Sequence, residues 1–361
     1  MIQVSVVVPT FKRVEQTVKS LELLASSDGV GKEFELEIIV ADSTPDTSVK
    51  DAVESMFREG GSLFVASFDP RSQDQGHPSN PNADGAQKSS PPSFVYVKPD
   101  RPGIAANKNA GAKNAHGQIL IFSDSDMEVE KNTLLTTVNY LKNHDKVAAV
   151  GGSVIWKGGP YNGQKDRPRA EDRLVASGDT TYIEALYSRY LATYSKVFGA
   201  VGGYDEQVFN MRGEGSDLSI RYWRAGYPLA CEESIRVHHV HDVPDAAAVR
   251  VDHAEWGIAR DLLLLGYKYN MFDQDLQNFR ATVEINFSPI GAAGYYHLLR
   301  GIGKNMDMIA ADKPILDAFR ASDKPLYDFK FLEIFSDMHT CNECIASSLT
   351  RLTEARQNAF V

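Results

Sequence analysis

Short apolar runs alternate with segments of helical spacing along the first part of the chain, and this alternation restricts the fold more than any other feature. Residues Val4 to Pro9 form a β-branched run typical of a buried strand in a parallel sheet. Apolar residues three or four positions apart between Val14 and Leu24 predict an amphipathic helix. Further strands are predicted at 37–41, 94–97 and 119–122, and further helices at 51–57 and 107–115. The pattern indicates βαβ units, and therefore an α/β fold with a mostly parallel central sheet flanked by helices.

Composition narrows the classes of function. The 361 residues include 38 Lys and Arg against 48 Asp and Glu, and the net charge of −10 argues against a general nucleic-acid binder, which needs a basic surface. Three cysteines do not make a disulfide framework, and Cys341 and Cys344 lack the second pair that a zinc site needs. No apolar run approaches the roughly 20 residues of a membrane-spanning helix, and Met1 to Ser5 does not resemble a signal peptide. We therefore expect a cytoplasmic protein.

Polar clusters follow the predicted strands, at residues 10–13, 42–44 and 124–126. In open α/β sheets ligands bind beyond the carboxyl ends of the strands, so we expect these clusters to converge on one rim. Asp124 and Asp126 are separated by one residue, and two such carboxylates are costly unless they are solvated or bridged by a cation. Oxygen ligands of this kind suit Mg²⁺ or Mn²⁺, with phosphate oxygens completing the shell. Lys108, in the small-residue segment 103–117, carries a charge that could meet a diphosphate, or is a solvated lysine on a close-packed helix.

Six segments, taken in order, resemble the family 2 glycosyltransferases, which have the GT-A nucleotide-sugar fold. They are SVVVPTFKR, VADSTPD, GIAANKNAGAKNAHGQILIFSDSDMEVE, VGGYDE, RGEGSDLSIRYWRAGY and VHHVHD, and together they extend from residue 2 to about 242. The resemblance implies a Rossmann-like catalytic domain at residues 1–245. Within it, the Pro-, Ser-, Asn- and Gly-rich residues 71–93 predict a disordered surface insertion, with a mobile lid as the alternative.

The resemblance also implies which residues bind the donor, a nucleotide-diphosphate sugar with a UDP-sugar favoured. The expected donor contacts are Pro9, Thr10, Arg13, Asp42, Gly103, Lys108, Asp124 and Ser125. Lys108 stands where the family usually has arginine, so the charge is kept but the forked geometry is lost. Asp124, Asp126 and His239 are the expected ligands of Mn²⁺ or Mg²⁺, with His241 in reserve and His238 on the opposite face of a regular strand.

The acidic motif departs from the family at Gly215, where the family usually has the aspartate that serves as base. Either Glu214 or Asp217 takes that role, or the acceptor is activated otherwise, and for Asp217 the alternative is N-capping of the following helix. The same stretch resembles the Gly-Glu-Asn motif of retaining polypeptide N-acetylgalactosaminyltransferases.

The expected reaction is metal-dependent transfer of the sugar to an acceptor hydroxyl, with inversion. The alternatives are a retaining transferase and a catalytically weakened nucleotide-sugar-binding protein. The acceptor is a glycan, a lipid or a peptide, and the aromatic candidates for stacking on sugars, with core packing as the alternative, are Trp156, Tyr161, Tyr204, Trp223 and Trp256.

Residues 246–361 predict a helical C-terminal region that binds the acceptor or forms a homo-oligomer. Within it, Phe287 to Leu299 is apolar and aromatic enough for peripheral contact with a membrane, although packing against the catalytic domain is the simpler interpretation.

Overall fold

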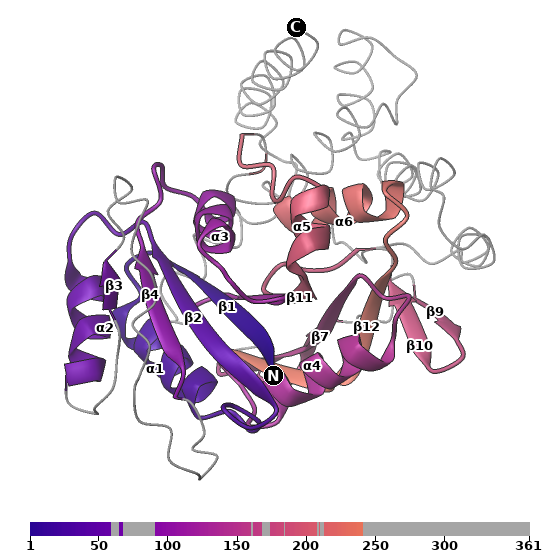
Figure 1. The fold of residues 1–361 in the computed structure, drawn as a ribbon, viewed down its shortest axis with the longest axis horizontal. Helices are drawn as coiled ribbons and strands as arrows, with labels where there is room; N and C mark the ends of the chain where they lie inside the picture. The colour runs from indigo at the N-terminus through magenta and orange to yellow at the C-terminus, as the bar shows by residue number, and fades with distance from the viewer. Residues whose placement is uncertain are drawn as a thin grey trace, which may run out of the picture.

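The computed structural model describes residues 1–58, 65–67, 91–159, 162–167, 174–183, 185–207, 209 and 213–240 (Figure 1). Most of the predicted insertion at 71–93 lies outside these residues, and Ser93 begins a strand. The predicted helical region 246–361 also lies outside them, as do Tyr161 and His241.

The strands of the described residues form one sheet, and its parallel half is the part that the sequence predicts. β1 (Ile2–Thr10) lies between β2 (Phe34–Asp42) and β5 (Ile119–Ser123) and is parallel to both. β4 (Ser93–Val97) extends the sheet beyond β2, and β3 (Val65–Ser67) extends it beyond β4, again in parallel. The predicted mostly parallel central sheet is therefore confirmed.

The other half of the sheet is mixed. β11 (Tyr190–Tyr194) runs antiparallel between β5 and β7 (Ala149–Lys157), and β12 (Leu229–Val240) pairs in parallel with β7. β10 (Thr180–Ile183) and β9 (Leu174–Ser177) continue antiparallel beyond β12. Two short strands attach to this half, β6 (Met127–Val129) on β12 and β8 (Lys165–Arg167) on β7.

Helices cover both faces of the sheet (Figure 1). α1 (Val14–Ala25) packs on β2 and β6, and α4 (Thr133–Asn143) packs on β7 and β12. α3 (Ile104–Lys113) packs on β1 and β2, α5 (Ser195–Ala200) on β11, and α6 (Glu214–Arg224) on β12, while α2 (Ser48–Arg58) packs on α1. None of the described helices is long and apolar enough to cross a membrane.

The core fills the space between these layers. Val4, Val6, Val7 and Val8 of β1 are inaccessible to solvent because helices cover both faces of the strand. Tyr204 and Trp223 also belong to this core, so the structure supports core packing for these two rather than stacking on a sugar.

A buried polar cluster fixes the connection from α3 to β5 at the amino ends of the strands. Glu37 accepts hydrogen bonds from the Ser5 hydroxyl (2.5 Å) and from the His116 backbone N–H (2.9 Å). The Ser5 hydroxyl oxygen accepts the N–H of Gly117 at 2.8 Å, and a Cβ at Gly117 would lie 2.5 Å from the Ser5 nitrogen. Glycine is therefore required at position 117, because the backbone of β1 approaches it closely. The cluster sets the register of β5, and Asp124 and Asp126, called the acidic turn below, follow the other end of that strand.

Candidate active site

The loops that follow β1 and β2 meet beside α3. The Asn107 side-chain amide donates to the Thr10 carbonyl (3.0 Å) and to the Ser43 hydroxyl (3.2 Å). The Lys12 backbone N–H donates to the Thr44 hydroxyl at 2.8 Å, which ties the two loops directly. The convergence of these strand ends on one rim, expected from the topology, is confirmed.

The loop after β1 contains a strained residue beside an exposed aromatic ring. Pro9 and Thr10 are paired in register with Ala41 and Asp42, so the loop begins where both strands end. Lys12 has φ of 59°, the left-handed region that residues with a side chain rarely adopt. The preceding residue, Phe11, is 50% exposed. Strain of this kind collects at functional sites, and Phe11 is a candidate that the sequence reasoning did not single out.

Asp42 is completely buried, and both of its carboxylate oxygens have protein partners. One oxygen accepts the Thr44 backbone N–H at 2.8 Å, and the other accepts the Tyr96 hydroxyl at 2.7 Å. Burial raises the pKa of the Tyr96 phenol, and its hydrogen bond to the Asp42 carboxylate raises it further. Asp42 therefore holds the shape of the rim in this structure, and its direct contact with a nucleoside stays a prediction.

Asp124 and Asp126 sit in a tight turn after β5, and their carboxylates have different partners. The turn is closed by the Met127 N–H, which donates to the Asp124 carbonyl at 2.9 Å, and Ser125 within it is buried. The Asp126 carboxylate pairs with the Arg13 guanidinium and lies 3.2 Å from Nε2 of His239. The Asp124 carboxylate instead lies 3.0 Å from the Lys108 ammonium.

The two histidines of β12 lie on opposite faces, as the strand period predicts. His239 faces Asp126, with the Trp156 ring centroid 4.2 Å from its own, whereas His238 contacts Glu130 at 3.1 Å. A carboxylate oxygen suits Mn²⁺ or Mg²⁺, and the imidazole beside it favours Mn²⁺, the softer of the two, so this pair fits a metal that takes its remaining ligands from phosphate and water. Among the described residues, no three His, Cys, Asp or Glu side chains are grouped to hold a metal. The third expected ligand, Asp124, faces Lys108 instead.

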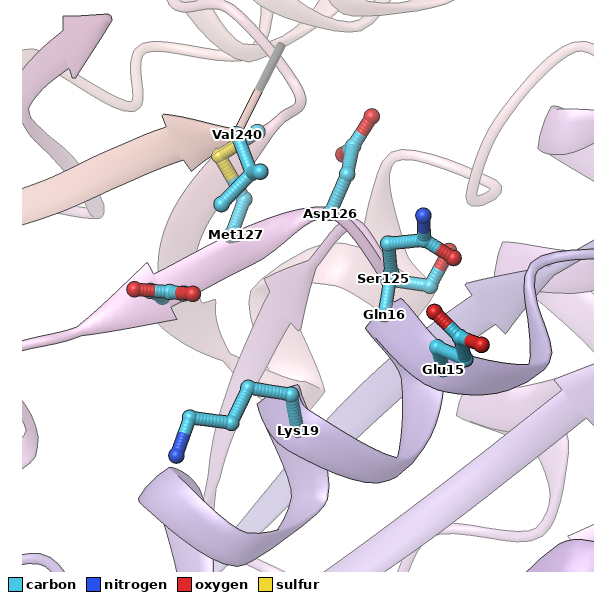
Figure 2. Close-up of a pocket in the computed structure, with 8 residues that line it drawn as sticks. Glu15, Gln16, Lys19, Ser125, Asp126, Met127 and Val240 are labelled. Carbon is cyan, nitrogen blue, oxygen red and sulfur yellow. The ribbon is translucent and has the colours of Figure 1, made fainter. Parts of the chain in front are cut away.

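A cavity of about 190 Å³ borders the acidic turn between α1, β6 and the end of β12 (Figure 2). Its lining residues are Glu15, Gln16, Lys19, Ser125, Asp126, Met127, Glu128 and Val240. Sites for drug-sized ligands occupy roughly 300–1,000 Å³, so the cavity adjoins the rim but is too small for a nucleotide sugar.

Lys108 and Glu214 form the buried side of the site. Lys108 is inaccessible to solvent and donates to the Ser188 carbonyl at 2.7 Å. Its ammonium lies 3.6 Å from Glu214, whose carboxylate also accepts the Ser188 hydroxyl. Gly103 precedes α3 with φ of 141°, a conformation that favours glycine where the chain turns into this helix.

Asp217 lies in the first turn of α6 and is completely buried. Its carboxylate accepts two hydrogen bonds from the Arg221 guanidinium, at 2.9 and 2.7 Å. The helix begins at Glu214, with Gly213 at the N-cap, so the N-cap interpretation of Asp217 is wrong. The ion pair with Arg221 accounts for its burial.

The sequence is similar to those of known glycosyltransferases. Residues 78–203 match the sequence model of the family described as Glycosyl transferase family 2. N-acetylgalactosaminyltransferase 4 of Drosophila melanogaster is 27% identical over 168 residues, which cover 42% of this chain and 26% of that protein. An uncharacterized glycosyltransferase of Bacillus subtilis is 28% identical over 153 residues, which cover 42% of this chain and 30% of that protein. The chain thus spans less than a third of the length of these curated relatives.

One solved glycosyltransferase structure has a fold similar to that of this chain. A mannosyltransferase from Pyrobaculum calidifontis, in complex with GDP-Man and Mn²⁺, superposes with a TM-score of 0.51 at 15% identity, covering 99% of this chain and 86% of that one. The fold is therefore that of the GT-A glycosyltransferases. The resemblance to family 2 is confirmed by the match at residues 78–203, which include α3 and the acidic turn.

Proposed function

We propose that the protein transfers a sugar from a nucleotide-diphosphate donor, preferentially a UDP-sugar, to the hydroxyl of a glycan, lipid or peptide acceptor. The observation that carries the proposal is the meeting of Arg13, Asp126 and His239 at the carboxyl ends of the strands. A cationic side chain, a carboxylate and an imidazole together suit a diphosphate with its divalent cation. The match to residues 78–203 supports this assignment, because the acidic turn falls within it.

In this proposal each part of the rim has a role in holding the donor. The loop of Pro9, Thr10 and Phe11 lies over the nucleoside, and the buried Asp42 keeps that loop in shape through Thr44. Asp126 and His239 hold Mn²⁺ or Mg²⁺, which when bound would neutralise charge on the leaving diphosphate. Arg13, which is 34% exposed, turns from Asp126 to the diphosphate. Preorganised charge at the leaving group is where catalysis gains most.

Glu214 is the proposed base in an inverting reaction. It takes the proton of the acceptor hydroxyl while that oxygen forms the bond to the anomeric carbon and the diphosphate leaves with the bonding electrons. Of the two carboxylates considered, Glu214 is the one on the Lys108 side of the rim. Asp217 is engaged by Arg221.

A retaining outcome is the second candidate, and the burial of both carboxylates favours it. Glu214 is 8% exposed and Asp217 is inaccessible, so little of either side chain is open to an acceptor hydroxyl in the described arrangement. Several of the curated relatives are N-acetylgalactosaminyltransferases, and the sequence around Glu214 resembles the motif of retaining members of that class.

The test is release of nucleoside diphosphate from a panel of UDP-, GDP- and dTDP-sugars, with and without Mn²⁺. We expect metal-dependent release from one donor, which is lost in Asp126→Asn and kept in Glu130→Gln. Glu130 is a matched control because it is an acid four residues further on that contacts His238. The anomeric configuration of the transferred sugar, read by NMR, then separates inversion from retention. Absence of nucleotide binding to the wild-type protein contradicts the proposal.

A further inference from the structure

We propose that Lys108 is a positioning residue that holds Asp124 and Glu214 together, and that it does not contact the donor diphosphate. This inference rests on the proposed function, since it assigns the parts of that same site. It departs from the expectation that a lysine at this position meets the phosphates.

The Lys108 ammonium is surrounded by oxygen atoms of the protein. A lysine ammonium has three N–H groups, and three protein oxygens surround the one on Lys108. They are the Ser188 carbonyl at 2.7 Å, Asp124 at 3.0 Å and Glu214 at 3.6 Å. One N–H donates to the Ser188 carbonyl, and the two carboxylates pair with the charge of the ammonium, so protein groups already compensate this cation.

Lys108 lies deeper in the protein than the two carboxylates that pair with it. The Lys108 side chain is inaccessible, while the side chains of Asp124 and Glu214 are 22% and 11% exposed. The Tyr204 ring, with its centroid 5.6 Å from the ammonium, closes the site further on the inside. The two carboxylates therefore lie between the ammonium and any ligand on the rim, and Lys108 acts on a ligand through them.

Ser188 belongs to a segment that packs against the start of α6. The Ser188 hydroxyl donates to Glu214, and its carbonyl accepts from Lys108, so one residue bonds both members of the pair. A Cβ at Gly215 would lie 2.8 Å from the Leu186 carbonyl oxygen and 3.0 Å from the Ser188 nitrogen. Glycine at 215 thus permits the close approach that brings Ser188 between Lys108 and Glu214. The space that a side chain at position 215 would need is filled by the backbone of Leu186 and Ser188.

The decisive comparison is between Lys108→Met and Arg13→Met, which remove the buried and the partly exposed cation of the same rim. Calorimetric titration in Mn²⁺ gives the ratio of the dissociation constants of uridine and UDP for each variant, or of the nucleoside and diphosphate of whichever donor proves active. We expect Lys108→Met to keep this ratio within about twofold of wild type while kcat falls about 100-fold, with KM little changed. We expect Arg13→Met to lower the ratio about tenfold, the loss of a charge-assisted hydrogen bond.

The variant Lys108→Arg adds a second readout. An arginine serves a diphosphate at least as well as a lysine, whereas the closed space around Lys108 does not hold the larger fork. We expect kcat to stay low in Lys108→Arg. Recovery of kcat in this variant, or a fall of the affinity ratio in Lys108→Met as large as in Arg13→Met, overturns the proposal.

If Lys108→Met does not fold, amine labelling of the wild-type protein tests whether the Lys108 side chain is accessible. The protein is treated with acetic anhydride with and without UDP and Mn²⁺, and modified lysines are read by mass spectrometry, with exposed Lys12 and Lys19 showing that the reagent acts. We expect Lys108 to stay unmodified in both samples, and its modification in the free protein overturns the proposal. Labelling needs no nucleotide binding, so a failure of the proposed function, in which no nucleotide binds at all, is seen separately in the titrations.

Discussion

The substitution Gly215→Ala separates the effect of packing from the effect of helix propensity. Gly215 is the second residue of α6, and its added methyl would lie 2.8 Å from the Leu186 carbonyl oxygen and 3.0 Å from the Ser188 nitrogen. Both are backbone atoms, so no flexible side chain can give way. Overpacking of this kind costs about 1–3 kcal/mol, against which alanine gains about 0.5–1 kcal/mol of helix propensity. We therefore expect a net loss of about 1 kcal/mol, and at most about 2.5 kcal/mol, in the free energy of unfolding.

The same clash displaces Ser188 from Glu214, so we expect the rate of donor turnover to fall by about tenfold or more. Gly199→Ala in α5 is the matched control, because nothing lies within 4 Å of its Cβ position. The control should gain about 0.5 kcal/mol and keep its turnover. Urea denaturation followed by circular dichroism gives the stabilities, and the diphosphate-release assay gives the rates. Equal stability and equal turnover of the two variants would refute the packing argument.

Three further predictions concern single side chains. Asp217→Asn breaks a buried ion pair, so we expect a loss of about 3 kcal/mol in urea denaturation, whereas a catalytic Asp217 would lower kcat at unchanged stability. Tyr96→Phe removes one partner of the buried Asp42, and we expect the free energy of unfolding to fall by about 1–3 kcal/mol in urea denaturation, with unchanged stability as the contrary result. His239→Ala should weaken Mn²⁺ binding in the presence of nucleoside diphosphate at least about tenfold, while His238→Ala on the opposite face leaves it unchanged; equal effects would contradict the assignment.

The parallel half of the sheet was predictable because its strands are buried on both faces, and such strands have nearly continuous apolar sequences. Val4 to Pro9 and Ile119 to Phe122 are such runs, and β1 and β5 extend them by only a few residues. β8 and β9 are not predicted from the sequence. These strands have three and four residues, and they exist through pairing with β7 and β10 rather than through a pattern of their own.

At the candidate site, the sequence predicted which residues come together but not how their charges are paired. The acidic turn follows β5 and His239 faces it, as the order of elements and the strand period require. The partners of the cations were not predictable, because Arg13 and Asp126 are 113 residues apart and meet only through tertiary packing. The burial of Lys108 depends in the same way on Ser188, which no motif marks.

The central claim is that a nucleoside diphosphate and its metal bind at the rim formed by Arg13, Asp126 and His239. The most direct test is a crystal of the protein grown with Mn²⁺ and the nucleoside diphosphate released by the active donor, with data collected at the manganese absorption edge. We expect one strong anomalous peak between Asp126 and His239, next to the diphosphate, with Lys108 still buried behind Asp124. Nucleotide and manganese at another place on the protein would contradict it.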